Sequence, residues 1–138
     1  MQRMANMQRM TVPYVTASAD RFERLARIAS VQRMDLCQVS TVAELESWLA
    51  SNRTAVLITD SQLEDGDWLD ALECCRSHAP ETRLVVTART DSPSLWTEVA
   101  EAGAVDFIAQ PFYAPEVRRC LRTLAEFEGR EQLAEAAI

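Results

Sequence analysis

The chain has 138 residues, a formal net charge of −7 and a hydrophobic fraction of 48%, which indicates one globular domain with a single core. The acidic balance argues against nucleic acid as a direct ligand, because phosphate backbones require a concentrated positive surface. The apolar runs are only a few residues long, far short of a membrane span. We therefore expect a cytoplasmic protein with a domain over residues 11–128, a flexible leader over residues 1–10, and a tail or the start of a linker over residues 129–138.

Short apolar runs alternate with amphipathic helical patterns along the chain. The expected strands cover residues 12–16, 36–39, 55–59, 84–87 and 105–109. Thr41 is expected to cap the second helix, Gly103 to end the fourth as a left-handed cap, and Gly129 to end the fifth. This alternation predicts parallel βαβ units. The expected fold is α/β and flavodoxin-like, a doubly wound sheet of five parallel strands in the order 2-1-3-4-5.

The apolar face of each expected helix predicts its buried residues. These are Phe22, Leu25, Ile28 and Ala29 in the first helix, Val42, Leu45, Trp48 and Leu49 in the second, Leu69, Leu72 and Cys75 in the third, and Val117, Cys120, Leu121, Leu124 and Phe127 in the last. The fourth helix is expected to start at Ser92 and Pro93, after a loop over residues 89–91.

The acidic residue Asp60 follows the buried third strand and precedes a turn over residues 65–67. Open α/β sheets place their chemistry at the carboxyl ends of the strands. Asp60 is therefore the first candidate for a functional residue.

Three segments carry a resemblance to response-regulator receiver domains. Residues 60–69 (DSQLEDGDWL) resemble the phosphoacceptor segment D-x-x-L-P-D-G-x-G-L, residues 84–88 (LVVTA) resemble the strand that ends in Thr-Ala, and residues 103–112 (GAVDFIAQPF) resemble G-A-x-D-Y/F-L-x-K-P-F. Three ordered matches at compatible spacing make coincidence improbable. The resemblance covers the chain from Val12 to about Phe127.

The resemblance implies roles for individual residues. Asp60 matches the aspartate that accepts a phosphoryl group, and Thr87 and Phe107 match the switch hydroxyl and switch aromatic. Gln110 takes the place of the lysine that contacts the phosphoryl group, and Pro111 matches the proline of a turn that is often cis. Gln62 matches the residue whose backbone carbonyl binds Mg²⁺ in the family. These positions, with no catalytic residue beyond them, form the expected site of a signalling domain that is not an enzyme.

The expected metal site is degenerate. Thr16 and Ala17 stand where the family has two acidic Mg²⁺ ligands, and Gln110 carries no charge. Asp20 lies further along, where it either favours the helix dipole or reaches the site through a shifted loop. Magnesium is usually held by one or two carboxylates together with phosphate oxygens, so we expect weak or absent Mg²⁺ binding. Trp68 stands where the family has a small glycine, and its ring is a second obstacle to consider.

Two functions remain open. The first is a degenerate receiver that acts in two-component phosphorelay signalling through protein contact, and the alternative is a functional phosphoacceptor phosphorylated at Asp60 by a histidine kinase. A flavin enzyme is disfavoured, because residues 17–19 lack a hydroxyl- and glycine-rich phosphate loop. The resemblance implies a protein partner, a histidine kinase or an output protein, on the face made by the fourth helix, fifth strand and fifth helix. The same face is where a homodimer would form.

Overall fold

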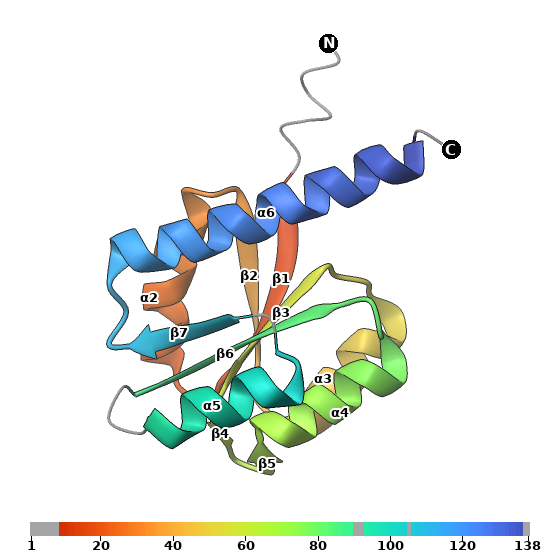
Figure 1. The fold of residues 1–138 in the computed structure, drawn as a ribbon. Helices are drawn as coiled ribbons and strands as arrows, with labels where there is room; N and C mark the ends of the chain where they lie inside the picture. The colour runs from red at the N-terminus through yellow and green to blue at the C-terminus, as the bar shows by residue number, and fades with distance from the viewer. Residues whose placement is uncertain (1–8, 90–92, 105, 137–138) are drawn as a thin grey trace.

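A five-stranded parallel sheet forms the centre of the molecule (Figure 1). The computed structural model describes residues 9–89, 93–104 and 106–136, with side chains described up to residue 126. The strands run in the order β2-β1-β3-β6-β7, which confirms the predicted order 2-1-3-4-5. Their bounds are Met10–Val15 (β1), Met34–Val39 (β2), Val56–Asp60 (β3), Arg83–Arg89 (β6) and Asp106–Gln110 (β7). No helix within the described residues is long and apolar enough to cross a membrane.

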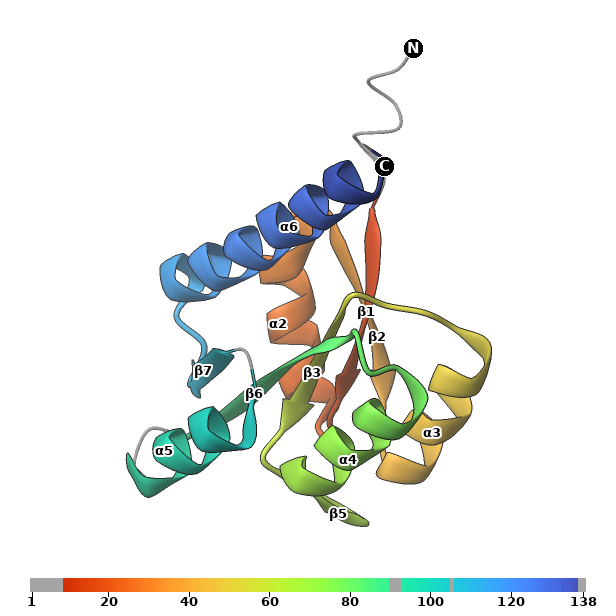
Figure 2. The ribbon, with the colours of Figure 1, turned by 45° about the vertical axis from the view of Figure 1, so that its right-hand side comes forward.

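Helices cover both faces of the sheet, and each face has its own apolar core (Figures 1 and 2). One face is covered by α2 (Ala19–Ser30) and α6 (Ala114–Ala136), and the other by α3 (Val42–Ser51), α4 (Trp68–His78) and α5 (Pro93–Ala102). Side chains of each strand alternate between the two cores, so that Leu57 belongs to one and Ile58 to the other. This alternation decides which helix each strand-end residue meets.

The structure corrects two predictions about the helices. Helix α6 continues through Gly129 to Ala136, because one glycine lowers helix stability by only about 1 kcal/mol. Leu69 is exposed, whereas Trp68 is buried in the core. Helix α4 begins at Trp68, so its buried stripe runs through Trp68, Ala71, Leu72 and Cys75 at i, i+3, i+4 and i+7. The Trp68 ring thus packs into the core.

The other buried helix residues were predicted well. Leu25, Ala29, Leu45, Leu49, Val117, Leu121 and Leu124 are buried, with Phe22, Ile28, Trp48 and Cys120 partly buried against them. Val42, predicted as buried, is only partly buried at the first position of α3. Gly103 has φ of +97°, which confirms the left-handed cap. Met10, predicted in the leader, is the first residue of β1, and Arg89, predicted in the loop over residues 89–91, is the last residue of β6. Residues 1–8 of the leader, residues 90–91 of the loop, the helix start at Ser92, the strand start at Val105 and the Phe127 side chain lie outside the described residues.

A small hairpin of β4 (Gln62–Leu63) and β5 (Gly66–Asp67) follows β3 and was not predicted. Its Asp65 carboxylate accepts hydrogen bonds from the backbone N–H groups of Val42 (2.8 Å) and Ala43 (3.1 Å) at the start of α3. Thr41 caps the same helix as predicted, through its hydroxyl and the N–H of Glu44 (3.1 Å). The hairpin therefore ties the loop after Asp60 to the N-terminus of α3.

The Asp65 contact predicts a pH-dependent contribution to stability. The N–H of Val42, together with that of Ala43, lowers the pKa of the Asp65 carboxyl. A carboxyl whose pKa is lowered on folding stabilises the fold above its unfolded pKa of about 3.9, and this contribution is lost as the pH falls through the folded value. Asp65→Asn should therefore lower the free energy of unfolding at pH 7, measured by urea denaturation, and the difference from the parent should shrink toward pH 3.

Glu64→Gln is the matched control, because Glu64 is an exposed acid of the same hairpin. It should leave the urea midpoint unchanged at both pH values. An Asp65→Asn loss that is the same at pH 7 and pH 3 would show that the carboxylate charge does not contribute.

Candidate functional site

Asp60 is the last residue of β3 and is 3% exposed. It pairs in register with Thr87 of β6, as expected for two residues at the same sheet edge. On the other side of β3, Tyr14 of β1 pairs with Ile58. Because side chains two residues apart share a sheet face, Asp60 points to the same side as Ile58 and Tyr14, which is the side of α2.

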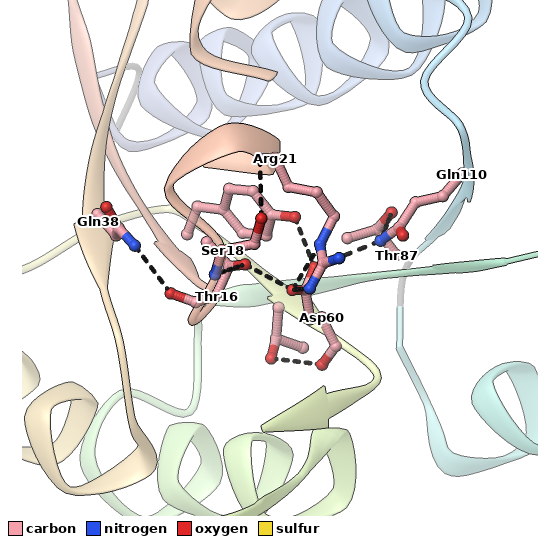
Figure 3. Close-up of polar contacts among 9 residues, drawn as sticks. Thr16, Ser18, Arg21, Gln38, Asp60, Thr87 and Gln110 are labelled. Atoms are coloured by element: carbon pink, nitrogen blue, oxygen red, sulfur yellow. Dashed lines mark hydrogen bonds and ion pairs between the residues drawn. The ribbon is translucent and has the colours of Figure 1, made fainter. Parts of the chain in front are cut away.

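Four side chains donate hydrogen bonds to the Asp60 carboxylate (Figure 3). Oδ1 accepts from the Tyr14 hydroxyl (2.5 Å) and from Gln110 Nε2 (3.4 Å). Oδ2 accepts from the Thr16 hydroxyl (2.6 Å) and from Nε (3.2 Å) and Nη2 (3.0 Å) of Arg21. Each carboxylate oxygen has two lone pairs. Both oxygens of Asp60 are therefore fully engaged within the protein.

Arg21 supplies the positive charge that balances Asp60. Burial lowers the pKa of the Arg21 guanidinium, but the charge and hydrogen bonds of Asp60 together raise it by more. The net shift of the Arg21 pKa is therefore upward. Burial also raises the pKa of the Tyr14 hydroxyl, and the neighbouring Asp60 charge raises it further. Tyr14 is thus a neutral donor and Arg21 a permanent cation. The pair of Asp60 and Arg21 carries no net charge.

The first turn of α2 holds Arg21 over the sheet edge. Ser18 is the N-cap of this helix, and its hydroxyl accepts a hydrogen bond from the Arg21 N–H (3.1 Å). The Ser18 N–H in turn donates to the Thr16 hydroxyl (3.1 Å), and Gln38 of β2 donates to the Thr16 carbonyl (3.1 Å). One chain of hydrogen bonds therefore links the helix cap, the end of β1 and the carboxylate.

Three of the other expected positions, Thr87, Gln110 and Pro111, lie at this edge, whereas Phe107 does not. Gln110 Nε2 donates to the buried Thr87 hydroxyl (3.2 Å) as well as to Asp60. The Gln110–Pro111 peptide is cis, as expected. Phe107 lies away from Asp60, half-buried on β7, with its ring centroid 4.5 Å from that of Trp96 on α5.

The residues around Asp60 do not fit a magnesium site. Thr16 donates its hydroxyl proton to Asp60, Ala17 is exposed without a polar side chain, and Asp20 points away into an exposed ion pair with Arg24 (3.2 Å). Gln62 lies in the hairpin, paired with Asp67. The described residues contain no cluster of three His, Cys, Asp or Glu side chains. A cation from α2 stands beside Asp60 where the resemblance implied a metal.

Sequence reasoning missed Tyr14 and Arg21. Tyr14 carried a readable signal, because Tyr14 and Thr16 alternate on one face of β1 and parallel pairing with β3 brings that face to Asp60. Arg21 gave a weaker signal, because α2 contains three arginines and only the helix phase selects the one that reaches the sheet edge.

The ion pair predicts a measurable coupling. Arg21→Gln leaves a buried carboxylate without its countercharge, and because the Arg21 side chain is 42% exposed we expect a loss of about 1–3 kcal/mol in the free energy of unfolding, less than for a fully buried pair. In an Asp60→Asn background the same substitution should have a smaller effect. Urea denaturation of the parent, Arg21→Gln, Asp60→Asn and the double variant measures the coupling energy between Arg21 and Asp60.

Arg24→Gln provides the control, because Arg24 lies on the same helix in an exposed ion pair and should change stability by less than about 0.5 kcal/mol. Equal losses from Arg21→Gln in both backgrounds would mean that Arg21 does not stabilise the charge of Asp60.

Comparison with known proteins shows relatives in sequence and in fold. The chain is 29% identical over 93 residues to the swarming motility regulation protein RssB of Serratia marcescens, a match that covers 67% of this chain and 42% of RssB. The photosynthetic apparatus regulatory protein RegA of Cereibacter sphaeroides is 29% identical over 104 residues, covering 75% of this chain and 56% of RegA. The chain thus spans about half the length of the curated relatives it matches.

Solved structures share the fold at low identity. The chemotaxis response regulator CheY4 of Vibrio cholerae superposes with a TM-score of 0.75 at 16% identity, covering 85% of this chain and 99% of CheY4. The beryllofluoride-activated NtrC4 receiver domain dimer gives 0.77 at 18% identity, covering 84% of this chain and 96% of that one. Residues 6–122 match the family described as the response regulator receiver domain. The chain therefore belongs to the response regulator receiver domain family.

Proposed function

We propose that this receiver domain is degenerate and acts in two-component signalling through protein contact, without phosphorylation of Asp60. The observation that carries the proposal is the engagement of both Asp60 oxygens by Tyr14, Thr16, Arg21 and Gln110. Attack on phosphorus requires a carboxylate oxygen with a free lone pair that faces the donor. In the described geometry at least one hydrogen bond must break before Asp60 can react.

Charge and desolvation add to this barrier. An aspartyl phosphate carries about −1.5 to −2 charges in place of the single negative charge of the carboxylate, whereas Arg21 supplies only one positive charge. Removing one preorganised group that stabilises transition-state charge typically costs about 3 kcal/mol, on the order of a hundredfold in rate. Here two acids and a lysine are replaced by Thr16, Ala17 and Gln110. These replacements also support weak or absent Mg²⁺ binding.

One observation favours the alternative, a functional phosphoacceptor phosphorylated by a histidine kinase. Asp60, Thr87 and Gln110 lie together at one sheet edge, in the arrangement that the family resemblance implies for the acceptor, the switch hydroxyl and the lysine position. If Arg21 swung outward, Oδ2 of Asp60 would keep only its hydrogen bond from Thr16. Phosphate uptake by the intact chain distinguishes the two proposals.

The proposed partner surface is the face of α5, β7 and α6, which is the predicted face of the fourth helix, fifth strand and fifth helix. Trp96 is 47% exposed there and contacts Phe107, and Asp106 and Arg119 border the same surface depression. Large exposed aromatic side chains are typical of protein contact sites. A histidine kinase or an output protein is the proposed partner, and a second copy of this chain is the alternative, as in the similar NtrC4 receiver dimer.

The proposal predicts that the chain does not gain a phosphate. Incubation with Mg²⁺ and acetyl phosphate should leave the intact mass unchanged, because neither a metal site nor a free carboxylate oxygen is available. A prompt gain of one phosphate that Asp60→Ala abolishes would refute the degenerate proposal and show that Asp60 is a working phosphoacceptor.

Restoring the charged residues of the family tests why Asp60 should fail to accept a phosphoryl group. The triple variant Thr16→Asp, Ala17→Asp and Gln110→Lys keeps Arg21, which should pair with the new carboxylates in place of Mg²⁺. Adding Arg21→Ala should release them, so the quadruple variant should take up phosphate at least about tenfold faster than the triple. Circular dichroism checks that both are folded. A folded quadruple variant that remains inert would mean that the missing charges and Arg21 are not the obstacle.

The proposed face also predicts the behaviour of any self-associated form. Arg122→Glu on α6 should shift the sedimentation of a dimer toward the monomer, because Arg122 is exposed on that helix. Arg27→Glu on α2 makes the same charge change away from this face and should leave the sedimentation unchanged. A dimer that survives Arg122→Glu and dissociates in Arg27→Glu would place the contact elsewhere.

A further inference from the structure

Residues 18–22, the N-cap and the first turn of α2, are held in place more by polar contacts than by the apolar core, and we call them the clasp. The fully buried side chains of α2 are Leu25 and Ala29, which lie in its second and third turns. Within the clasp, Phe22 is the one apolar side chain that packs against the core, and it is only partly buried. A segment with few buried apolar contacts opens locally at low cost in free energy. Hydrogen bonds and charge must therefore supply most of what keeps the clasp on the sheet edge.

A closed ring of contacts joins the clasp to Asp60 (Figure 3). The Thr16 hydroxyl donates to Asp60 Oδ2 (2.6 Å) and accepts a hydrogen bond from the Ser18 N–H (3.1 Å). The Ser18 hydroxyl accepts from the Arg21 N–H (3.1 Å), and Nη2 of Arg21 returns to Oδ2 (3.0 Å). One carboxylate oxygen therefore holds the clasp by two routes, through the side chain of Arg21 and through its backbone.

The clasp has space on its outer side. A hollow of about 360 Å³ separates Arg21 and Arg24 of α2 from residues 110–112 of the segment after β7. The side chain of Arg21 is 42% exposed, whereas Asp60 is buried. When the ion pair breaks, the hollow gives the guanidinium a solvated position outside the sheet edge, and no fully buried side chain of α2 has to move.

We propose that the clasp is a conformational switch that responds to the charge of Asp60. It is closed while Asp60 is a carboxylate and opens locally when that charge is neutralised. In the open state Arg21 leaves Asp60, and Phe22 leaves the Tyr14 ring, whose centroid lies 6.4 Å from its own in the closed state. Coupling between two sites is reciprocal, so a partner that binds the open clasp also frees Asp60 from Arg21. The switch needs no phosphoryl transfer and does not depend on the proposed function.

Hydrogen exchange of single backbone amides in the intact chain, followed by NMR, measures the opening. The clasp amides are those of Arg21 and Phe22, which donate to the hydroxyl and the carbonyl of Ser18. Leu45 is the reference, because its N–H donates to the carbonyl of the N-cap Thr41 (3.0 Å) at the equivalent place in α3. Each measured rate is divided by the intrinsic exchange rate of the same sequence, so that only the opening is compared.

Asp60→Asn removes the charge and keeps the shape of the side chain. It should speed the exchange of both clasp amides at least about tenfold relative to Leu45, because opening then no longer breaks a charge-assisted hydrogen bond. The hydrogen bonds of the Asp60 side chain come from other side chains and not from the backbone of α2. An effect of this substitution on the clasp amides is therefore transmitted through Thr16 and Arg21.

Arg21→Gln breaks the same ion pair from the other side and should speed the clasp amides to a similar extent. In the double variant with Asp60→Asn, the acceleration should match that of either single variant, because both substitutions remove one contact. Arg24→Gln is the matched control, because Arg24 lies on the same helix in an exposed ion pair with Asp20 (3.2 Å). It should change the clasp rates by about twofold or less. Since the two test variants lie on opposite sides of the ion pair, either one supports the measurement if the other does not fold.

Three outcomes would overturn the proposal. The first is unchanged exchange of the clasp amides in Asp60→Asn and Arg21→Gln. The second is equal acceleration at Leu45, which would show a general loss of stability and no local opening. The third is an acceleration in Arg24→Gln as large as that in Arg21→Gln, which would show that any lost charge on α2 has this effect. The samples contain neither a phosphodonor nor Mg²⁺, so the result is separate from the test of phosphate uptake by Asp60.

Discussion

The buried negative charge of Asp60 is the constraint on which the site depends. Transferring a carboxylate out of water costs several kcal/mol unless a cation and hydrogen bonds replace the lost solvent. Here the cation is Arg21, and Tyr14, Thr16 and Gln110 complete the shell. The receiver fold has thus kept an acidic residue at its sheet edge, together with an internal guanidinium as its counterion. In the structure the positive charge that balances Asp60 comes from the protein itself.

The sheet and the first helix together make this arrangement possible. Parallel pairing of β1 with β3 brings the Tyr14 and Thr16 face to Asp60, and the Ser18 cap sets where α2 begins. Arg21 then reaches the carboxylate from the first turn of the helix. The Arg21 side chain is 42% exposed, whereas Asp60 is buried. One side chain therefore connects the buried carboxylate to the surface.

The sequence allowed the sheet order and most buried helix faces to be predicted, because periodicity and turn residues are local signals. The residues beside Asp60, such as Thr87 and Gln110, were predicted from the resemblance to receiver domains. It did not predict that Trp68 would be buried or that α6 would pass Gly129, since both depend on where packing sets a helix boundary. Arg21 was missed for a related reason. The absence of the two acids could be predicted from the residue types at positions 16 and 17. The cation beside Asp60 is Arg21, a helix residue whose direction depends on helix phase.

The central claim is that the Arg21 guanidinium holds the place of the metal and closes Asp60 to phosphoryl chemistry. Crystals of the chain soaked with Mg²⁺ and beryllium fluoride test it directly, because this mixture mimics a phosphorylated aspartate with its metal. The account predicts that Arg21 remains bonded to Asp60 Oδ2, with no beryllium density on the carboxylate and no ordered metal beside it. A beryllofluoride adduct on Asp60 with Mg²⁺ bound and Arg21 displaced would contradict it.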